Sequence, residues 1–324
     1  MSFAESCLCF ALVGIGASAM WGPVLTITQR WFSLKRRGMA LGILSTGFGL
    51  GFGLTGKLFP IIVEQWSWRY CWYAMGVAAL FMILLNGVLL RSKPEDMGLC
   101  PWGGGSGIGP VPQVLEEDRE RAGRYSEMLQ APRFWMIGFS YLLSAATLYG
   151  VTTYMVDYAR YNLEFSYEKA SSLATVHGVS QIVGVLVILP FSDYLGRRLT
   201  LIASNLILSL SLAGLIVSGR NEIGLWISIA VFGAFYGITF PMYGACGGDY
   251  FRKEIIGSVI GAWTPFYGLG AIGSHRLTGY LRDTTGSFFA PFLIMILGTL
   301  GASMLMFFMR YPPGGKGRLG IDRS

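Results

Sequence analysis

Charge is scarce in this 324-residue chain. Charged side chains make up 13% of the residues, whereas hydrophobic residues make up 53% and the mean hydropathy is +0.52. Soluble domains carry about twice that share of charge, so the composition excludes an ordinary soluble domain. Acidic residues are fewer than basic ones, which leaves a net charge of +7. We interpret this excess as the Lys/Arg bias of loops on one side of a membrane, and we expect no nucleic-acid partner.

The chain also has few residues of the kinds that bind metals or attack substrates. It has two histidines, His177 and His275, and five cysteines that follow no zinc, haem or disulfide spacing. The sequence contains no paired-carboxylate or nucleophile constellation. We therefore expect no metal, no cofactor and no enzymatic activity. The cysteines are Cys7, Cys9, Cys71, Cys100 and Cys246.

Long apolar runs are what the chain has in abundance. Nine runs reach the length of about 20 residues that a membrane helix requires. Their linkers are short except residues 91–133, which hold a glycine-rich stretch and a charged run. The pattern predicts an all-α integral membrane protein in contact with membrane lipid, with three helices before this linker and six after it. The runs are 7–29, 38–63, 68–90, 134–157, 168–190, 199–218, 223–246, 255–280 and 287–309.

Basic residues fix the expected orientation. Of the 25 Lys and Arg residues, 18 fall on the side of the membrane that holds the linker and the C-terminal tail. Because cytoplasmic loops carry the Lys/Arg excess, this side is predicted to be cytoplasmic. Nine crossings then place Met1 on the opposite side.

An internal repeat accounts for the odd number of helices. Moving the sequence by 219 residues places the runs 7–29, 38–63 and 68–90 on the last three runs, and it aligns Lys57 with Arg276. Parallel repeats of this kind are a transporter architecture, although a glycine-rich chain also produces chance matches. The partners of 134–218 would precede Met1. We therefore expect a two-half helical bundle of which this chain holds nine of twelve transmembrane helices, truncated at the N-terminus.

A short polar junction lies between the runs 168–190 and 199–218. It reads Phe-Ser-Asp-Tyr-Leu-Gly-Arg-Arg over residues 191–198. Asp193 is expected to cap the helix that follows, where free N–H groups favour a carboxylate. Gly196 permits a tight reversal, and Arg197 with Arg198 holds the loop on the cytoplasmic side. The alternative is an ordinary short loop whose arginines only set topology.

These residues resemble the major facilitator superfamily over essentially the whole chain. Residues 193–198 are similar to its signature loop between helices eight and nine, although Leu189 stands at the usual leading glycine. The glycine ladder over 47–53 is similar to a second superfamily pattern on helix five. Residues 30–42, Trp68-Arg69, 93–98 and 279–286 resemble the oxalate/formate antiporter and monocarboxylate transporter branch.

The resemblance implies a secondary active transporter of a small organic solute, working by alternating access with a proton or a counter-anion. It implies a multi-pass protein of the plasma (inner) membrane, with Asp193, Gly196, Arg197 and Arg198 as a gating loop. The implied domains are 1–90 for the remainder of the N-terminal half, 91–133 for a cytoplasmic linker, 134–310 for the six-helix C-terminal half and 311–324 for a cytoplasmic tail.

Polar and aromatic residues within the runs are the candidates for solute or proton contacts, because intramembrane polar groups mark transport pathways. A structural role for His177, membrane-surface anchoring of Lys57 and Arg276, and packing of the aromatic residues are the alternatives. The candidates are His177, Gln181, Lys57, Arg276, Tyr149, Tyr154, Trp263 and Tyr267.

One departure from the family pattern bears on the substrate. Carboxylate-transporting relatives carry an arginine on helix eight about two turns before the signature aspartate. Val185 stands at that place here, and no arginine occurs between Lys169 and Arg197. A carboxylate is therefore one option among small organic solutes. The competing hypotheses are a truncated remnant that does not transport and a membrane-embedded enzyme.

Overall fold

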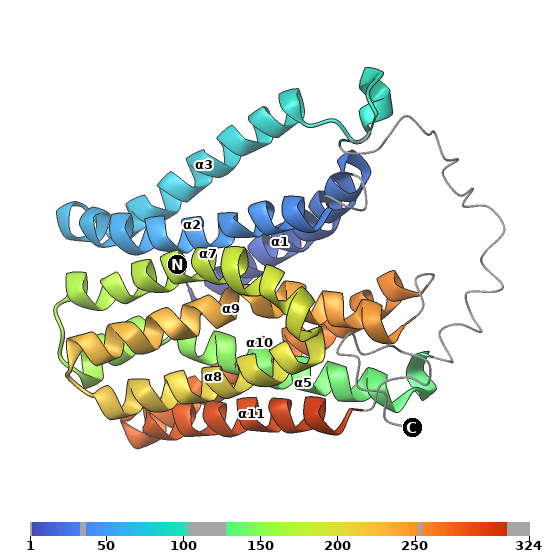
Figure 1. Ribbon diagram of the computed structural model, residues 1–324. Helices are drawn as coiled ribbons and strands as arrows, with labels where there is room; N and C mark the ends of the chain where they lie inside the picture. Colours follow the sequence, from blue (N-terminus) through green and yellow to red (C-terminus); the bar gives the residue numbers. More distant parts are fainter. Residues whose placement is uncertain (1, 33–36, 101, 103–127, 252–254, 310–324) are drawn as a thin grey trace. The chain divides into compact units, whose positions relative to one another are not determined.

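The computed structural model describes residues 2–32, 37–100, 102, 128–251 and 255–309 (Figure 1). Almost every described residue lies in a helix, as the apolar runs predict. The chain divides into two compact units, which are described separately below. Unit 1 comprises residues 1–44 and 68–112, and unit 2 comprises residues 45–67 and 113–324. Helix α2 (Arg37–Gln65) contributes residues to both.

Unit 1 contains α1 (Phe3–Trp31), the start of α2, α3 (Trp68–Leu89) and a 3₁₀ turn at Pro94–Met97. A capping box starts α1, because the Ser2 hydroxyl accepts from the backbone of Glu5 while the Glu5 carboxylate accepts from that of Ser2. At the other end of α1, the Trp31 indole donates to the Arg91 carbonyl oxygen at 2.8 Å. These contacts fasten both ends of α1 within its own unit.

Unit 2 contains the second part of α2 and the remaining helices. These are α5 (Pro132–Thr152), α6 (Met155–Asp157), the π-helical turn η2 (Tyr158–Asn162), α7 (Tyr167–Leu195), α8 (Arg197–Ser218), α9 (Glu222–Tyr250), α10 (Ile256–Thr285) and α11 (Phe289–Phe308). Helix α7 packs on α9, α9 on α8, α8 on α11, α11 on α5, and α5 on α10. Six long helices thus form one bundle (Figure 1).

Helix α5 ends earlier than the apolar run 134–157 predicts. Its last α-helical residue is Thr152, and the chain continues through the single turn α6 into η2. The Thr152 hydroxyl donates to the Leu148 carbonyl oxygen at 2.6 Å. Threonine side chains that bond back to the preceding turn loosen and bend helices. The break therefore coincides with the local sequence Val151-Thr152-Thr153, which apolar length alone does not reveal.

The junction at residues 191–198 is tighter than a loop. Helix α7 continues to Leu195 and α8 begins at Arg197, so a single residue separates the two helices. That residue is Gly196, whose φ of 87° and ψ of 135° suit glycine and disfavour residues with a side chain. The predicted role of Gly196 in a tight reversal is confirmed. The N-cap position of α8 is held by Gly196, whereas the backbone of Asp193 belongs to the last turn of α7.

The helix bounds follow the 219-residue repeat. Moving α1 by 219 residues gives 222–250, which are the bounds of α9. Moving α2 gives 256–284, and α10 spans 256–285. Moving α3 gives 287–308, and α11 spans 289–308. The repeat found in the sequence is therefore also a repeat of helices.

The ends of α1 and α9 also match. Ser2 and Asn221, which correspond under the shift, each accept a hydrogen bond from the backbone N–H three residues later at 3.3 Å. At the C-terminal ends, Phe32 and Phe251 correspond, both have extended backbones, and both close the last turn with their N–H groups. The same capping geometry therefore begins and ends both helices.

Seven helices in the described part of the chain are long and apolar enough to cross a membrane, and a shorter apolar helix covers Phe3–Ala17. The all-α prediction is confirmed, whereas the count of nine stays a prediction. Helix α10 is not among the seven; glycine and polar residues are frequent along it, and its second half also carries His275, Arg276, Arg282 and Asp283. Polar groups on that half lower its hydropathy, although the helix is 30 residues long.

The interior of unit 2 has a polar layer between two apolar clusters. The Tyr243 hydroxyl lies 2.6 Å from the Ser140 hydroxyl and 2.9 Å from that of Ser144, and Ser144 donates to the Asn205 Oδ1 at 2.8 Å. These four buried residues join α5, α8 and α9. One apolar cluster includes Leu148, Leu212 and Phe292, and the other includes Phe134, Leu201 and Trp263.

Candidate functional site

The two arginines of the junction contact two different helices. The Arg197 Nη1 atom donates to the Ala245 carbonyl oxygen at 2.7 Å and to the Asp249 carboxylate at 3.1 Å, both near the end of α9. Arg198 donates through Nε to the Met306 carbonyl oxygen at 2.9 Å and through Nη2 to that of Phe307. Cations are favoured near the C-terminal end of a helix, where the helix dipole is negative and the last carbonyl groups lack partners within the helix. The junction therefore connects α8 to the ends of α9 and α11.

His177 and Gln181 lie one helical turn apart on the face of α7 that meets α9. The close approach depends on glycines, because a Cβ at Gly233 would lie 3.0 Å from His177 Nδ1 and a Cβ at Gly237 would lie 2.8 Å from Gln181 Cγ. His177 is 0% exposed, and neither ring nitrogen has a hydrogen-bond partner in the described structure. The Gln181 Oε1 atom is likewise buried and has no hydrogen-bond partner in the described structure.

Aromatic rings from two other helices enclose His177. Phe52 on α2 has its ring centroid 5.1 Å away, and on α9 Phe232 lies at 5.9 Å and Tyr236 at 4.9 Å. Helix α2 approaches α7 here through the predicted glycine ladder, because a Cβ on Gly178 would lie 2.4 Å from the Gly53 nitrogen. Small residues allow such close helix contacts within membranes. His177 thus sits where α2, α7 and α9 meet.

A group of half-buried tyrosines, here called the tyrosine surface, lies on α5, α9 and α10. It consists of Tyr149, Tyr236 and Tyr267. The ring centroids of Tyr149 and Tyr267 are 5.6 Å apart, and Tyr236 interacts with both through its hydroxyl. Because each phenol can donate and accept a hydrogen bond, three on one surface can bind a polar solute. The ring of Tyr236 also contacts His177 and so connects that residue to this surface.

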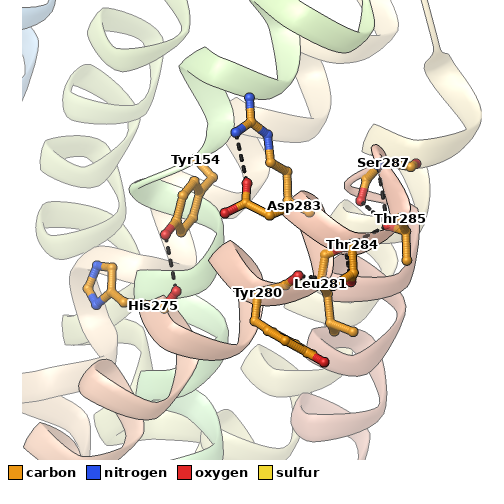
Figure 2. A network of polar contacts seen from close by, with 9 residues as sticks. Tyr154, His275, Tyr280, Leu281, Asp283, Thr284, Thr285 and Ser287 are labelled. Atoms are coloured by element: carbon orange, nitrogen blue, oxygen red, sulfur yellow. Dashed lines mark hydrogen bonds and ion pairs between the residues drawn. The ribbon is translucent and has the colours of Figure 1, made fainter.

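A second histidine adjoins the tyrosine surface. His275 on α10 has its ring centroid 5.8 Å from that of Tyr149, and its Nε2 atom lies 2.7 Å from the Thr153 hydroxyl. Figure 2 shows the Tyr154 hydroxyl pointing at the His275 carbonyl oxygen, to which it donates at 3.1 Å.

The other predicted site residues lie apart from this group. Trp263 is 1% exposed, stacks on Phe134 and donates its indole N–H to the Phe134 carbonyl oxygen at 3.0 Å. Lys57 on α2 and Arg276 on α10 project from exposed positions. The side chain of Asp193 lies outside what the structure describes, as do residues 103–127 of the linker and the tail 311–324. The roles predicted for these residues stay predictions.

Several residues of the site were not among the sequence candidates, namely Tyr236, Thr153, His275 and Asp249. Thr153 follows Tyr149 by four residues at the end of α5, and His275 follows Tyr267 by eight on α10, so helical spacing places each pair on one face. That periodicity was the available signal for Thr153 and His275. Asp249 carried a weaker signal, since a carboxylate near a helix end has many uses.

Sequence comparison identifies relatives along nearly the whole chain. The profile of the Major Facilitator Superfamily matches residues 2–274 and again 137–323. Monocarboxylate transporter 12-B of Danio rerio is 23% identical over 91% of this chain and 65% of its own length. The hexuronate transporter of Bacillus subtilis (strain 168) is 21% identical over 87% of this chain and 67% of its own length. The chain thus spans about two thirds of the length of these relatives.

Solved structures show the same fold. The crystal structure of the E. coli fucose:proton symporter matches with a TM-score of 0.60 at 15% identity, over 84% of this chain and 68% of that one. A bacterial homologue of the human lysosomal transporter Spinster, in an inward-facing conformation, matches with a TM-score of 0.50 at 14% identity, over 88% of this chain and 70% of that one.

The helical fold, the repeated helix bounds and the profile match over more than half of the sequence agree with the resemblance found in residues 193–198. The chain belongs to the Major Facilitator Superfamily and is a multi-pass integral protein of the plasma membrane.

Proposed function

We propose that this chain belongs to a secondary active transporter that moves a small organic solute by alternating access. The observation that carries the proposal is the tyrosine surface, on which α5, α9 and α10 present hydroxyl groups next to His177 and His275. Solute sites in such transporters lie between helices near mid-membrane, and buried polar groups there mark the transport route. Half-buried phenols at the junction of three helices fit that description.

A carboxylate is the solute class that we favour. The names of the relatives refer to monocarboxylates and to hexuronates, both of which carry a carboxylate. Val185 occupies the position at which an arginine was expected, so the binding groups for an anion must lie elsewhere. Phenol donors on the tyrosine surface supply hydrogen bonds, and the exposed cations Lys57 and Arg276 supply attraction at the rim.

We further propose that all nine predicted helices cross the membrane, which includes α1 and α10. Residues 1–90 then belong to one half, 91–133 to a cytoplasmic linker, 134–310 to the second half and 311–324 to a tail. Asp193, Gly196, Arg197 and Arg198 act as a cytoplasmic gate. The contacts from Arg197 to α9 and from Arg198 to α11 support this role, because their release would free both helix ends.

Flux into liposomes that contain the purified 324-residue protein tests the proposal. We expect uptake of radiolabelled L-lactate or D-glucuronate that saturates and that falls in Tyr149→Phe and Tyr267→Phe variants. Tyr280→Phe is the matched control, since Tyr280 lies on α10 but is 67% exposed. Absence of binding and of flux for both solutes would contradict the proposal and favour the alternative that this chain does not transport.

A further inference from the structure

His275 joins two helices at the point where α5 stops being α-helical. Its Nε2 atom is 2.7 Å from the Thr153 hydroxyl, and its carbonyl oxygen accepts from the Tyr154 hydroxyl at 3.1 Å. Gly279 lies one turn further along α10, and a Cβ there would be 3.2 Å from the Tyr154 hydroxyl oxygen. The absence of a side chain at Gly279 therefore leaves room for the tyrosine contact. The histidine and its backbone are thus both held by the end of α5.

The hydrogen bonds of the His275 ring show which of its two nitrogens can take up a proton. Nδ1 lies 2.7 Å from the Ala271 carbonyl oxygen, which can only accept, so Nδ1 carries a hydrogen. In the neutral ring Nε2 then has a lone pair and accepts from the Thr153 hydroxyl. A proton that binds this lone pair turns Nε2 into a donor, and the Thr153 hydroxyl must turn round to accept.

The Nε2 lone pair of His275, which accepts from Thr153, lies at an exposed position, in contrast to the nitrogens of His177. Thr153 is exposed, and its hydrogen bond with His275 lies at the surface of unit 2. His177 is 0% exposed and lies among the rings of Phe52, Phe232 and Tyr236. Burying a charge without a partner is costly, so the enclosed histidine is the poorer proton acceptor.

Titratable and charged groups surround His275 from its own helix and from the helices packed against it. The segment that runs from α5 into α6 contributes Tyr149, Tyr154 and Asp157. Helix α10 contributes Tyr267, Arg276, Arg282 and Asp283. Helix α9 contributes Tyr236, which contacts Tyr149 and Tyr267. Arg282 and Asp283 form an ion pair at 3.1 Å and so offset each other. The ring centroids of Tyr149 and Tyr154 lie 5.8 Å and 6.4 Å from that of His275.

We propose that His275 is the proton-binding site of this chain and that its proton crosses the membrane together with a carboxylate solute. The inference rests on the proposed function. Tyr149 contacts both Tyr267 and His275, so a positive charge on the ring arises directly beside the tyrosine surface. A solute anion that binds there compensates the charge, and one proton with one carboxylate adds no net charge to the site.

Nuclear magnetic resonance tests proton binding without any solute. The sequence has two histidines, so a His177→Gln variant with ¹⁵N-labelled histidine reports on His275 alone. In lipid nanodiscs we expect Nε2 to change from a lone-pair nitrogen to an N–H as the pH is lowered. Nδ1 should remain protonated throughout. A ring whose Nε2 takes up no proton at any pH at which the protein stays folded would overturn the proposal.

Variants of the hydrogen-bond partner separate this role from a merely structural one. Thr153→Val removes the hydroxyl, whereas Thr153→Ser retains it at the same position. We expect the valine variant to shift the titration midpoint of His275 and the serine variant to restore the wild-type midpoint. Equal midpoints in all three proteins would show that the contact seen at Nε2 has no part in proton binding.

Flux in liposomes tests coupling. Gradient-driven accumulation of L-lactate or D-glucuronate should be lost in His275→Gln, while exchange of labelled for unlabelled solute without a gradient should persist. Thr153→Val serves as a second variant if His275→Gln does not fold, and Tyr280→Phe should match the wild type in both assays.

Gradient-driven accumulation that survives in His275→Gln would overturn the inference and leave the proposed function standing. If the wild type neither binds nor exchanges either solute, the proposed function and the coupling fail together, and the titration alone decides whether His275 binds a proton.

Discussion

Arg197 and Asp249 form an ion pair between α8 and α9, with 3.1 Å between Nη1 and Oδ1. The same Nη1 atom lies 2.7 Å from the Ala245 carbonyl oxygen, so the guanidinium also donates a hydrogen bond to the backbone of α9. The arginine side chain is 31% exposed and the aspartate 42%. Solvent screens such a pair, and its importance lies in where it fixes α8 relative to α9.

The first prediction concerns this pair. Because half-exposed ion pairs contribute about 1 kcal/mol or less, Asp249→Asn should lower the stability of the protein only slightly. Arg197→Ala should lower it more, since this variant also loses the contact with Ala245. Thermal unfolding in detergent measures both changes. A larger loss in Asp249→Asn than in Arg197→Ala would show that the carboxylate has a further partner of greater weight.

The second prediction concerns the contact between α7 and α9. A Cβ on Gly184 would lie 1.9 Å from the Ala234 carbonyl oxygen, a backbone atom that cannot move aside. Gly184→Ala should therefore force the helices apart and destabilise the protein by about 1–3 kcal/mol or more. The matched control is Gly244→Ala on α9, where a Cβ meets nothing within 4 Å. Alanine there should raise stability by up to about 1 kcal/mol, because it favours the helix. Similar melting temperatures for the two variants would contradict the packing described here.

The third prediction concerns the buried polar layer. Tyr243→Phe removes the hydroxyl that bonds to Ser140 and Ser144 and leaves those groups without this partner. Leaving buried polar groups unsatisfied costs about 1–3 kcal/mol, and we expect a loss of that size in thermal unfolding. The exposed Tyr280→Phe should change little. A further Ser144→Ala change should cost less in the Tyr243→Phe background than alone, and full additivity would argue against a shared network.

The fourth prediction concerns Glu164, which has a left-handed backbone with φ of 59°. That conformation costs a residue with a side chain about 1–2 kcal/mol. Glu164→Gly removes the strain and also the ion pair with Arg220. The side chains of Glu164 and Arg220 are 72% and 64% exposed, respectively. An exposed pair contributes about 1 kcal/mol at most, so the variant should be equally stable or more stable. Arg220→Gln isolates the contribution of the pair, and a marked loss in Glu164→Gly beyond that of Arg220→Gln would contradict the prediction.

Much of the fold could be predicted from the sequence because membrane helices are determined by length and hydropathy. The apolar runs and the 219-residue shift located the helices, and the glycine at position 196 located the turn. The break after Thr152 was missed because it depends on a hydroxyl bonding to its own backbone, which does not alter hydropathy. Asp193 was expected before the start of α8, but α7 continues past that residue, and Gly196 alone separates the two helices.

The site was harder to predict than the fold. His177 was recognised from its depth in a run, but its enclosure by Phe52 and Tyr236 depends on helices distant in sequence. The contact between His275 and Thr153 joins positions 122 residues apart. No periodicity within one helix specifies such a pair. Spacing identifies which residues share a face, whereas packing determines which faces meet.

The matched ends of α1 and α9 have a consequence for length. Each helix has 29 residues, which corresponds to about 43 Å at 1.5 Å per residue. The hydrocarbon core of a bilayer is about 30 Å thick, so each helix must tilt or project beyond it. The two helices differ widely in side chains but share both caps and the same number of turns. The same bilayer constrains both helices, and this common constraint explains why the two copies have the same length.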